Sequence, residues 1–123
     1  MTPTEHCRVE LKLPNDPRAL GAVRGALQHT ARHLGFAPND EEQLLALFDQ
    51  LLRPSLDFLP AGETISVLIQ EHPNRVEIEL VRPARNGEKW VPSNTLPGID
   101  QIEEETAAGQ NRLKLVKLLS AHN

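Results

Sequence analysis

Residues 63–81 have the sequence ETISVLIQEHPNRVEIELV, and this stretch decides the fold class. Apolar and polar residues alternate on both sides of a central His72-Pro73-Asn74 turn, and the apolar ones are Ile65, Val67, Ile69, Val76, Ile78 and Leu80. A period of two is typical of a strand with one buried face. The stretch therefore predicts an antiparallel hairpin with strands over 63–70 and 75–81.

Upstream of this hairpin the sequence predicts one strand and two helices. Residues 6–13 alternate in the same way, and Cys7 lies on their apolar side, so we expect Cys7 to be a buried core residue rather than a nucleophile. A helix is expected over 17–34, with Gly35 as the left-handed residue that closes it. A second helix is expected over 41–59, where acidic residues precede a broad leucine stripe.

Proline and glycine divide the remainder of the chain. Pro54 removes a backbone donor inside the second helix, so we expect that helix to bend near Arg53 or to end there. Residues 82–98 are rich in proline and glycine, which indicates a long loop. Residues 99–108 fit an acidic helix, and residues 111–121 fit a last helix by the spacing of their apolar side chains.

The order of these elements predicts the fold class. It is strand, helix, helix, strand, strand, loop and helix, which is typical of an α+β protein. We expect a two-layer sandwich with helices packed on one face of a small, mostly antiparallel sheet. A length of 123 residues favours a single domain that spans residues 1–123.

Composition excludes several classes of partner. The formal net charge of −4 gives no general attraction to nucleic acid or to an anionic membrane. The chain has no apolar run long enough for a membrane span, and its first residues do not resemble a signal peptide. A single cysteine excludes an internal disulfide and is typical of a reducing compartment. We therefore expect a cytoplasmic protein.

Several local patterns resemble the anti-sigma-factor serine kinases, which belong to the superfamily that includes the ATPase domains of histidine kinases and gyrase B. The similarity is carried by Ala22-Val23-Arg24 with Leu27 in the first helix, by Gly35-Phe36 after it, and by the distance to the second helix. It extends over nearly the whole chain. It implies a histidine kinase-like ATPase fold that is shortened at the C-terminus, because the family adds further strands after the last helix.

The resemblance also implies that the magnesium site has been lost. In such kinases the second helix carries a glutamate, a magnesium-binding asparagine four residues later and often a histidine four residues after that. Alignment on Leu45-Ala46-Leu47 puts Asp49, Arg53 and Asp57 at these positions. The guanidinium of Arg53 would repel a metal cation and cannot ligate it. The alternative interpretation of these three residues is an exposed ladder of ion pairs.

The adenine and phosphate elements of the family are altered as well. The family has D-x-G-x-G after the third strand, where this chain has Pro83-Ala84-Arg85-Asn86-Gly87. Pro83 replaces the adenine-binding aspartate, Arg85 replaces the first glycine, and only Gly87 matches. The later phosphate turn G-x-G-L corresponds to residues 109–113, which keep Gly109 and offer Arg112 as a phosphate contact. The resemblance thus implies a degenerate nucleotide site and no bound cofactor.

Other residues are candidates for partner contacts or metal binding. The partner candidates are Trp90 in the long loop and the acidic residues Glu103, Glu104 and Glu105. The alternatives are that Trp90 pins the loop to the core and that the acidic residues complement a helix dipole. His29 and His33 have the spacing of a metal pair on a helix, but no third ligand is apparent, so we interpret them as surface histidines.

These observations lead to one main hypothesis and two alternatives. The main hypothesis is a non-catalytic protein-binding regulator that resembles an anti-sigma factor of a partner-switching system. Its expected partner is a sigma factor, an anti-sigma antagonist or a response regulator, and the resemblance implies pairing of two copies. The first alternative is a divergent ATP- and magnesium-dependent serine kinase in which Asp49 orients the substrate hydroxyl. The second is a structural dimerisation module of a signalling complex.

Overall fold

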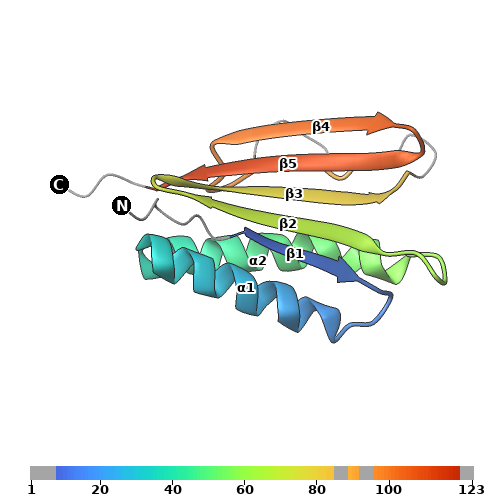
Figure 1. Cartoon of the computed structure of the whole chain (residues 1–123), viewed down its shortest axis with the longest axis horizontal. Helices are drawn as coiled ribbons and strands as arrows, with labels where there is room; N and C mark the ends of the chain where they lie inside the picture. Colours follow the sequence, from blue (N-terminus) through green and yellow to red (C-terminus); the bar gives the residue numbers. More distant parts are fainter. Residues whose placement is uncertain (1–7, 85–88, 92–95, 120–123) are drawn as a thin grey trace, which may run out of the picture.

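The computed structural model describes residues 8–84, 89–91 and 96–119. These residues form two layers, a five-stranded antiparallel sheet and two helices on one of its faces (Figure 1). The elements are β1 (Arg8–Leu13), α1 (Ala19–Leu34), α2 (Pro38–Asp57), β2 (Ile65–His72), β3 (Arg75–Pro83), β4 (Gln101–Ala107) and β5 (Gln110–Leu118). This arrangement confirms the predicted α+β class.

The predicted hairpin of β2 and β3 lies at the centre of the sheet. The strand order is β1-β2-β3-β5-β4, and all neighbours are antiparallel. In the hairpin Ile69 pairs with Ile78, so the apolar sides of both strands lie on the same face. That face is the one the helices cover, because a strand alternates its side chains between two faces.

The prediction of helices over 99–108 and 111–121 is wrong, because the structure has the strands β4 and β5 there. In β5 the buried Leu113 and Leu115 alternate with charged residues, and this period of two is masked by the apolar Val116 and Leu118 that follow them. The turn between the strands is formed by Ala108 and Gly109, whose φ angles are 54° and 76°. Two successive positive φ angles are typical of a tight hairpin turn.

Both predicted helices are present, with small differences at their ends. Gly35 follows α1 with a φ of 83°, as predicted for the residue that closes a helix. The second helix begins earlier than expected, at Pro38, where a proline suits the first turn. Of the bend or end expected near Arg53, the end is contradicted, because the helix continues past Pro54 to Asp57. Pro54 is exposed, so it can be accommodated on the outer side of the helix without displacing a core residue.

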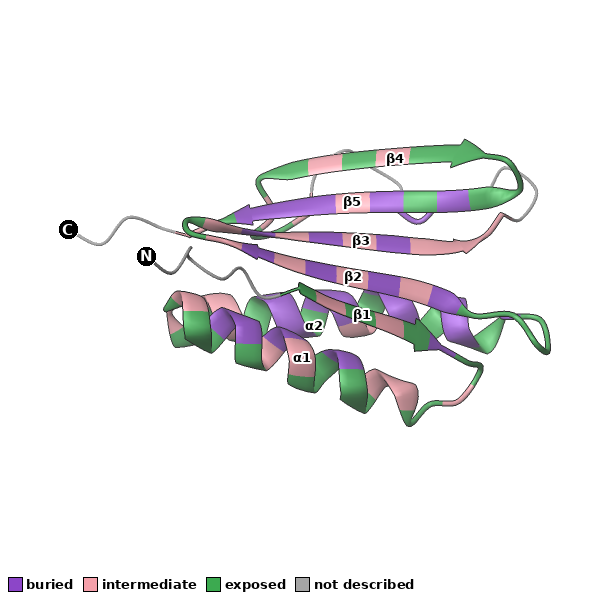
Figure 2. Ribbon diagram, in the orientation of Figure 1, coloured by how far each residue is buried: buried purple, intermediate pink, exposed green. Residues whose placement is uncertain are grey.

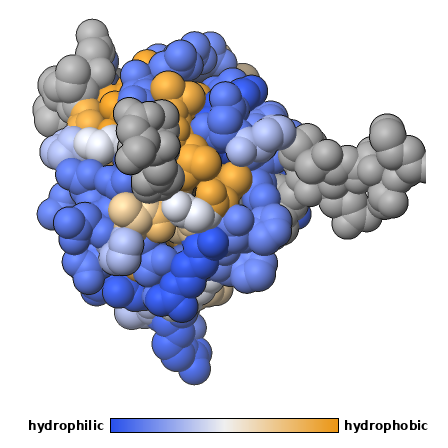
Figure 3. Space-filling view, turned by 90° about the vertical axis from the view of Figure 1, so that its left-hand side faces the viewer, coloured by the Kyte–Doolittle hydropathy of each residue, from blue (hydrophilic) through white to orange (hydrophobic). Residues whose placement is uncertain are grey.

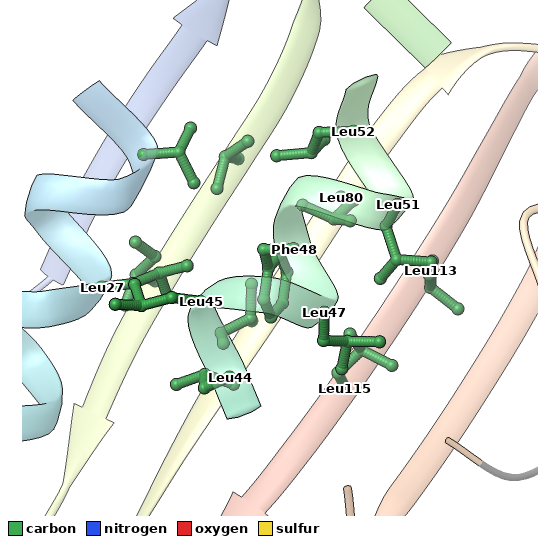
Figure 4. Close-up of a cluster of buried hydrophobic side chains, with 14 of the residues drawn as sticks. Leu27, Leu44, Leu45, Leu47, Phe48, Leu51, Leu52, Leu80, Leu113 and Leu115 are labelled. Carbon is green, nitrogen blue, oxygen red and sulfur yellow. The ribbon is translucent and has the colours of Figure 1, made fainter. Parts of the chain in front are cut away.

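The core lies between the helices and the inner face of the sheet (Figure 2). The second helix contributes more of it than any other element, and its leucines meet those of β3 and β5 around Phe48 (Figure 4). Its labelled members are Leu27, Leu44, Leu45, Leu47, Phe48, Leu51, Leu52, Leu80, Leu113 and Leu115. Burial of an apolar side chain of this size contributes roughly 1.5–3 kcal/mol, so this contact is the main source of stability.

The surface is mostly polar, with one apolar exception at an end of the molecule. Apolar side chains gather at the end where β5 stops, on the left in Figure 1 (Figure 3), and Leu118 is 45% exposed there. Among the described residues, neither helix has the length and apolar character that a membrane crossing requires. The prediction that Cys7 is buried concerns a residue outside the described ranges.

Candidate functional site

A polar cluster lies on the inner face of the sheet at the end where β3 stops. We call it the Trp90 network, and its members are Ser55, Arg82, Trp90, Glu104 and Asn111. Arg82 continues the inward side of β3, and its register partner Asn111 on β5 also points inward and is buried. Arg82 Nε donates to Asn111 Oδ1 at 2.9 Å, and Arg82 Nη1 donates to Ser55 Oγ at 2.7 Å. The guanidinium thus joins the sheet to α2.

Trp90 closes this cluster from the loop side. Its indole Nε1 donates to the backbone oxygen of Leu51 in α2 at 3.1 Å, and the residue is only 8% exposed. The guanidinium carbon of Arg82 lies 4.3 Å from the centre of the indole ring, which is a cation–π contact. This position agrees with the alternative that Trp90 pins the long loop to the core.

Glu104 ties the same loop segment to the sheet edge. Its carboxylate accepts hydrogen bonds from the backbone nitrogens of Trp90 at 2.7 Å and Val91 at 3.3 Å. It also accepts one from Asn111 Nδ2 at 3.0 Å. Because side chains alternate along β4, Glu103 and Glu105 point to the opposite, outer face. The three glutamates that the sequence grouped together therefore lie in two different environments.

On the outer face, Glu103 and Glu105 lie beside the basic side chains of β5. The register puts Glu103 opposite Lys114 and Glu105 opposite Arg112. The two cations nevertheless form their ion pairs with β3, Lys114 with Glu77 at 3.2 Å and Arg112 with Glu79 at 3.7 Å. In the described part of the chain, neither Glu103 nor Glu105 makes an ion pair. A shallow hollow of about 280 Å³ separates these groups.

The helix residues predicted to replace the magnesium site form an ion pair instead. Arg53 donates to both carboxylate oxygens of Asp49, from Nε at 3.2 Å and from Nη2 at 2.8 Å. The hydrogen bond and the charge of Asp49, helped by the charge of Asp57, raise the pKa of Arg53. Both members of the pair are substantially exposed. The geometry is that of a single exposed ion pair one helical turn apart, and in the described part of the chain Asp57 adds no second pair to it.

The structure does not bring Asp49, Arg53 and Asp57 to the end of β3. The hollow beside Pro83 has a volume of about 70 Å³ and is lined by Pro54, Ser55, Phe58, Leu59, Pro60, Arg82 and Pro83. Asp49 instead lines a groove between α1 and α2, beside Arg24. The positions of α2 that approach Pro83 are thus one residue further along the helix than the aligned ones.

The predicted phosphate turn has a different local structure. Gly109 lies next to the end of β3, where the backbone nitrogen of Ala84 donates to its carbonyl at 2.9 Å. The segment after it is a strand, so it offers no helix N-terminus to bind phosphate. Arg112 points to the outer face, toward Glu79. Arg85 and Gly87 lie outside the described residues. No group of three or more histidine, cysteine or carboxylate side chains within the described ranges could hold a metal ion.

Sequence reasoning missed three members of the Trp90 network, namely Ser55, Arg82 and Asn111. Arg82 and Asn111 are polar residues at inward positions of strands, which is a signal once β5 is recognised as a strand. Ser55 carried no such signal, because it lies on the buried side of α2 among Leu51, Leu52 and Leu56. In comparisons with known proteins, no family model matches the chain, and no curated protein matches it.

Proposed function

We propose that this chain is a non-catalytic, cytoplasmic regulatory domain that acts by binding another protein, in the manner of an anti-sigma factor in a partner-switching system. It would bind no nucleotide. The observation that carries this proposal is the Trp90 network, in which the chain's own side chains occupy the space between α2 and the end of β3.

That space is where the family resemblance would put the adenine, since the aligned aspartate position is Pro83. Trp90 fills it with an indole that is hydrogen-bonded to α2 and stacked on Arg82. A nucleotide would have to displace a buried aromatic side chain, and loss of such a contact costs several kcal/mol. Pro83 would give the base no side-chain acceptor in return.

The missing metal ligand supports the same proposal in either alignment of α2. With the aligned residues, the asparagine position holds Arg53, which is paired with Asp49. With the residues that approach Pro83, the position holds Pro54, and Phe58 follows four residues later. Neither proline nor phenylalanine has an oxygen in its side chain, whereas magnesium requires oxygen ligands. Arg53 fails for the opposite reason, because it brings a fixed positive charge.

The partner surface we propose is the outer side of β4, through Glu103 and Glu105. Both carboxylates are exposed and make no ion pair in the described part of the chain, so a basic partner can approach them without first breaking a contact. Charge complementarity of this kind accelerates association and selects partners. Glu104 has no such role, because it holds Trp90 and Asn111.

Two measurements test the proposal. Calorimetric titration of the whole chain with ATP and ADP, with and without magnesium, should give no heat of binding. In the second, immobilised wild-type protein should capture a specific basic protein from an extract of its source, and the purified partner should then bind directly. The double variant Glu103→Gln/Glu105→Gln should lose this partner and keep the wild-type melting temperature.

The matched control carries Glu42→Gln and Glu63→Gln, which remove the same number of charges at two exposed positions outside β4. This variant should capture the partner like the wild type. Magnesium-dependent binding of ATP would overturn the proposal and restore the kinase alternative. Equal capture by the wild type and the double variant would remove β4 from the interface.

A further inference from the structure

Two histidines lie one turn apart on α1 and face solvent. His29 and His33 are both exposed, and their rings are parallel within 1° with centres 6.2 Å apart. Residues four apart on a helix lie above one another on the same side. The helix backbone therefore holds the two imidazoles within reach of one metal ion, and the exposed ring of His29 turns its donor nitrogen toward His33 to share that ion.

One of these rings is also held from behind by a buried carboxylate. His33 Nδ1 lies 2.6 Å from Glu71 Oε1, and the side chain of Glu71 is only 6% exposed. Glu71 belongs to β2, whose inner face it shares with Ile65, Val67 and Ile69. Its second oxygen, Oε2, is buried and has no hydrogen-bond partner among the residues that the structure describes. Because a buried carboxylate requires compensation, it favours a proton on the Nδ1 that faces it.

That hydrogen bond determines what the other nitrogen of His33 can do. When Nδ1 carries the proton, Nε2 of a neutral imidazole keeps its lone pair and is available as a ligand. A carboxylate behind a histidine is the usual support of histidine ligands in metal sites, since it fixes the tautomer and strengthens the donor. His29 supplies a second imidazole at the spacing found in helical metal sites.

We propose that His29 and His33 form a two-ligand site for a divalent transition metal such as Zn²⁺ or Ni²⁺, with Glu71 as its positioning residue. Imidazole is a good ligand for these ions and a poor one for Mg²⁺ or Ca²⁺, which require oxygen. In the described part of the chain no third protein ligand completes the set. Water takes the remaining coordination positions, so the site is open to solvent. This inference is independent of the proposed function, because it uses different residues on a different element.

The test uses the whole chain, freed of metal by a chelator, and Zn²⁺ or Ni²⁺ alone as the probe. Calorimetric titration should show one site, and the melting temperature should rise with metal concentration. His29→Gln and His33→Gln should each abolish this site, and both positions are exposed, so the variants should fold. Glu71→Gln should bind the metal roughly 10–100-fold more weakly, as is typical when such a supporting residue is lost.

Two controls separate the site from other donors and from a purely structural role of Glu71. A His6→Gln/Cys7→Ser variant removes two potential metal donors that are consecutive in the sequence near the N-terminus. It should bind metal like the wild type. In nuclear magnetic resonance spectra, His33 should show the Nδ1-protonated tautomer in the wild type and lose this preference in Glu71→Gln. Absence of metal binding, or binding that survives His29→Gln but is lost in His6→Gln/Cys7→Ser, would overturn the site. Equal metal affinity in Glu71→Gln would overturn the role of Glu71.

Discussion

The inner face of the sheet carries an acidic side chain toward each end, and the two differ in how many of their hydrogen bonds are satisfied. Glu104 accepts hydrogen bonds from two backbone nitrogens and from the side-chain amide of Asn111, which in turn accepts one from Arg82. Glu71 is more deeply buried, yet among the described residues its carboxylate pairs with His33 alone, and one of its oxygens has no hydrogen-bond partner there. A fully paired polar cluster stabilises a fold, whereas a half-paired one costs stability. The end with Glu104 therefore has a structural role, whereas the end with Glu71 keeps a carboxylate that can support a ligand-binding histidine.

The largest expected effect comes from removing the aromatic centre of the fully paired end. Trp90→Ala should lower the free energy of unfolding by about 3–5 kcal/mol, because it empties a core position and leaves Arg82 without its ring. Urea unfolding followed by circular dichroism measures this. Trp90→Phe keeps an aromatic ring and loses the hydrogen bond to Leu51, so it should cost clearly less. A loss below about 1 kcal/mol in Trp90→Ala would mean that the network does not anchor the loop.

The second prediction compares the same change at three glutamates. Glu104→Gln should lower the free energy of unfolding by about 1–3 kcal/mol, because an amide cannot accept all the hydrogen bonds that the carboxylate accepts. Glu71→Gln should cost less than half as much, since that carboxylate has one contact to lose. Glu103→Gln, on the outer face, should change stability by less than about 0.5 kcal/mol. Equal losses for Glu104 and Glu71 would remove the distinction between the two ends.

The third prediction concerns Glu77, a carboxylate on the outer face that pairs with cations rather than with backbone donors. Burial opposes ionisation of Glu77, but its hydrogen bond with Lys114 and the charges of Lys114, His72 and Arg75 outweigh it, so the pKa of Glu77 is lowered. A lowered pKa contributes stability that is complete above the unfolded pKa and is lost as the pH falls through the folded one. Glu77→Gln should therefore cost less than about 1 kcal/mol at pH 7.

The difference between wild type and Glu77→Gln should shrink as the pH falls below about 4.3, the ordinary value for glutamate. Unfolding curves at pH 7 and at successive acidic values measure it. Glu10→Gln, at an exposed position on β1, is the control and should show less of this dependence. A difference that stays constant with pH would mean that the surrounding cations do not stabilise the ionised form of Glu77.

Much of the fold could be predicted from residue patterns, and the errors have a physical cause. The hairpin of β2 and β3 and both helices have a clear period, because one face is apolar and the other polar. In β5 the residues after Leu115 are Val116, Lys117 and Leu118, so the alternation breaks on both faces. Lys117 points inward and is buried, where its amine donates to the backbone oxygen of Gly98 at 2.8 Å. A buried lysine breaks the pattern from which strands are predicted.

The candidate site was less predictable, because it depends on which residues meet across the sheet. The sequence grouped Glu103, Glu104 and Glu105 by adjacency, although strand geometry separates the middle one from its neighbours. It singled out Trp90 but not Arg82, the residue on which the indole rests. It noted the spacing of His29 and His33 but not Glu71, which lies 38 residues further along from His33. Contacts of this kind are set by strand register rather than by local sequence.

The position of β1 at one edge of the sheet has a consequence for motion. Within the described residues β1 pairs with β2 alone, whereas β3 has a hydrogen-bonded neighbour on each side. The ladder through β2, β3, β5 and β4 stays intact when β1 separates, so that opening requires less than the full free energy of unfolding. Backbone amides of Arg8–Leu13 should exchange with deuterium well before those of Arg75–Pro83. Strand β1 can then open while the centre of the sheet stays paired.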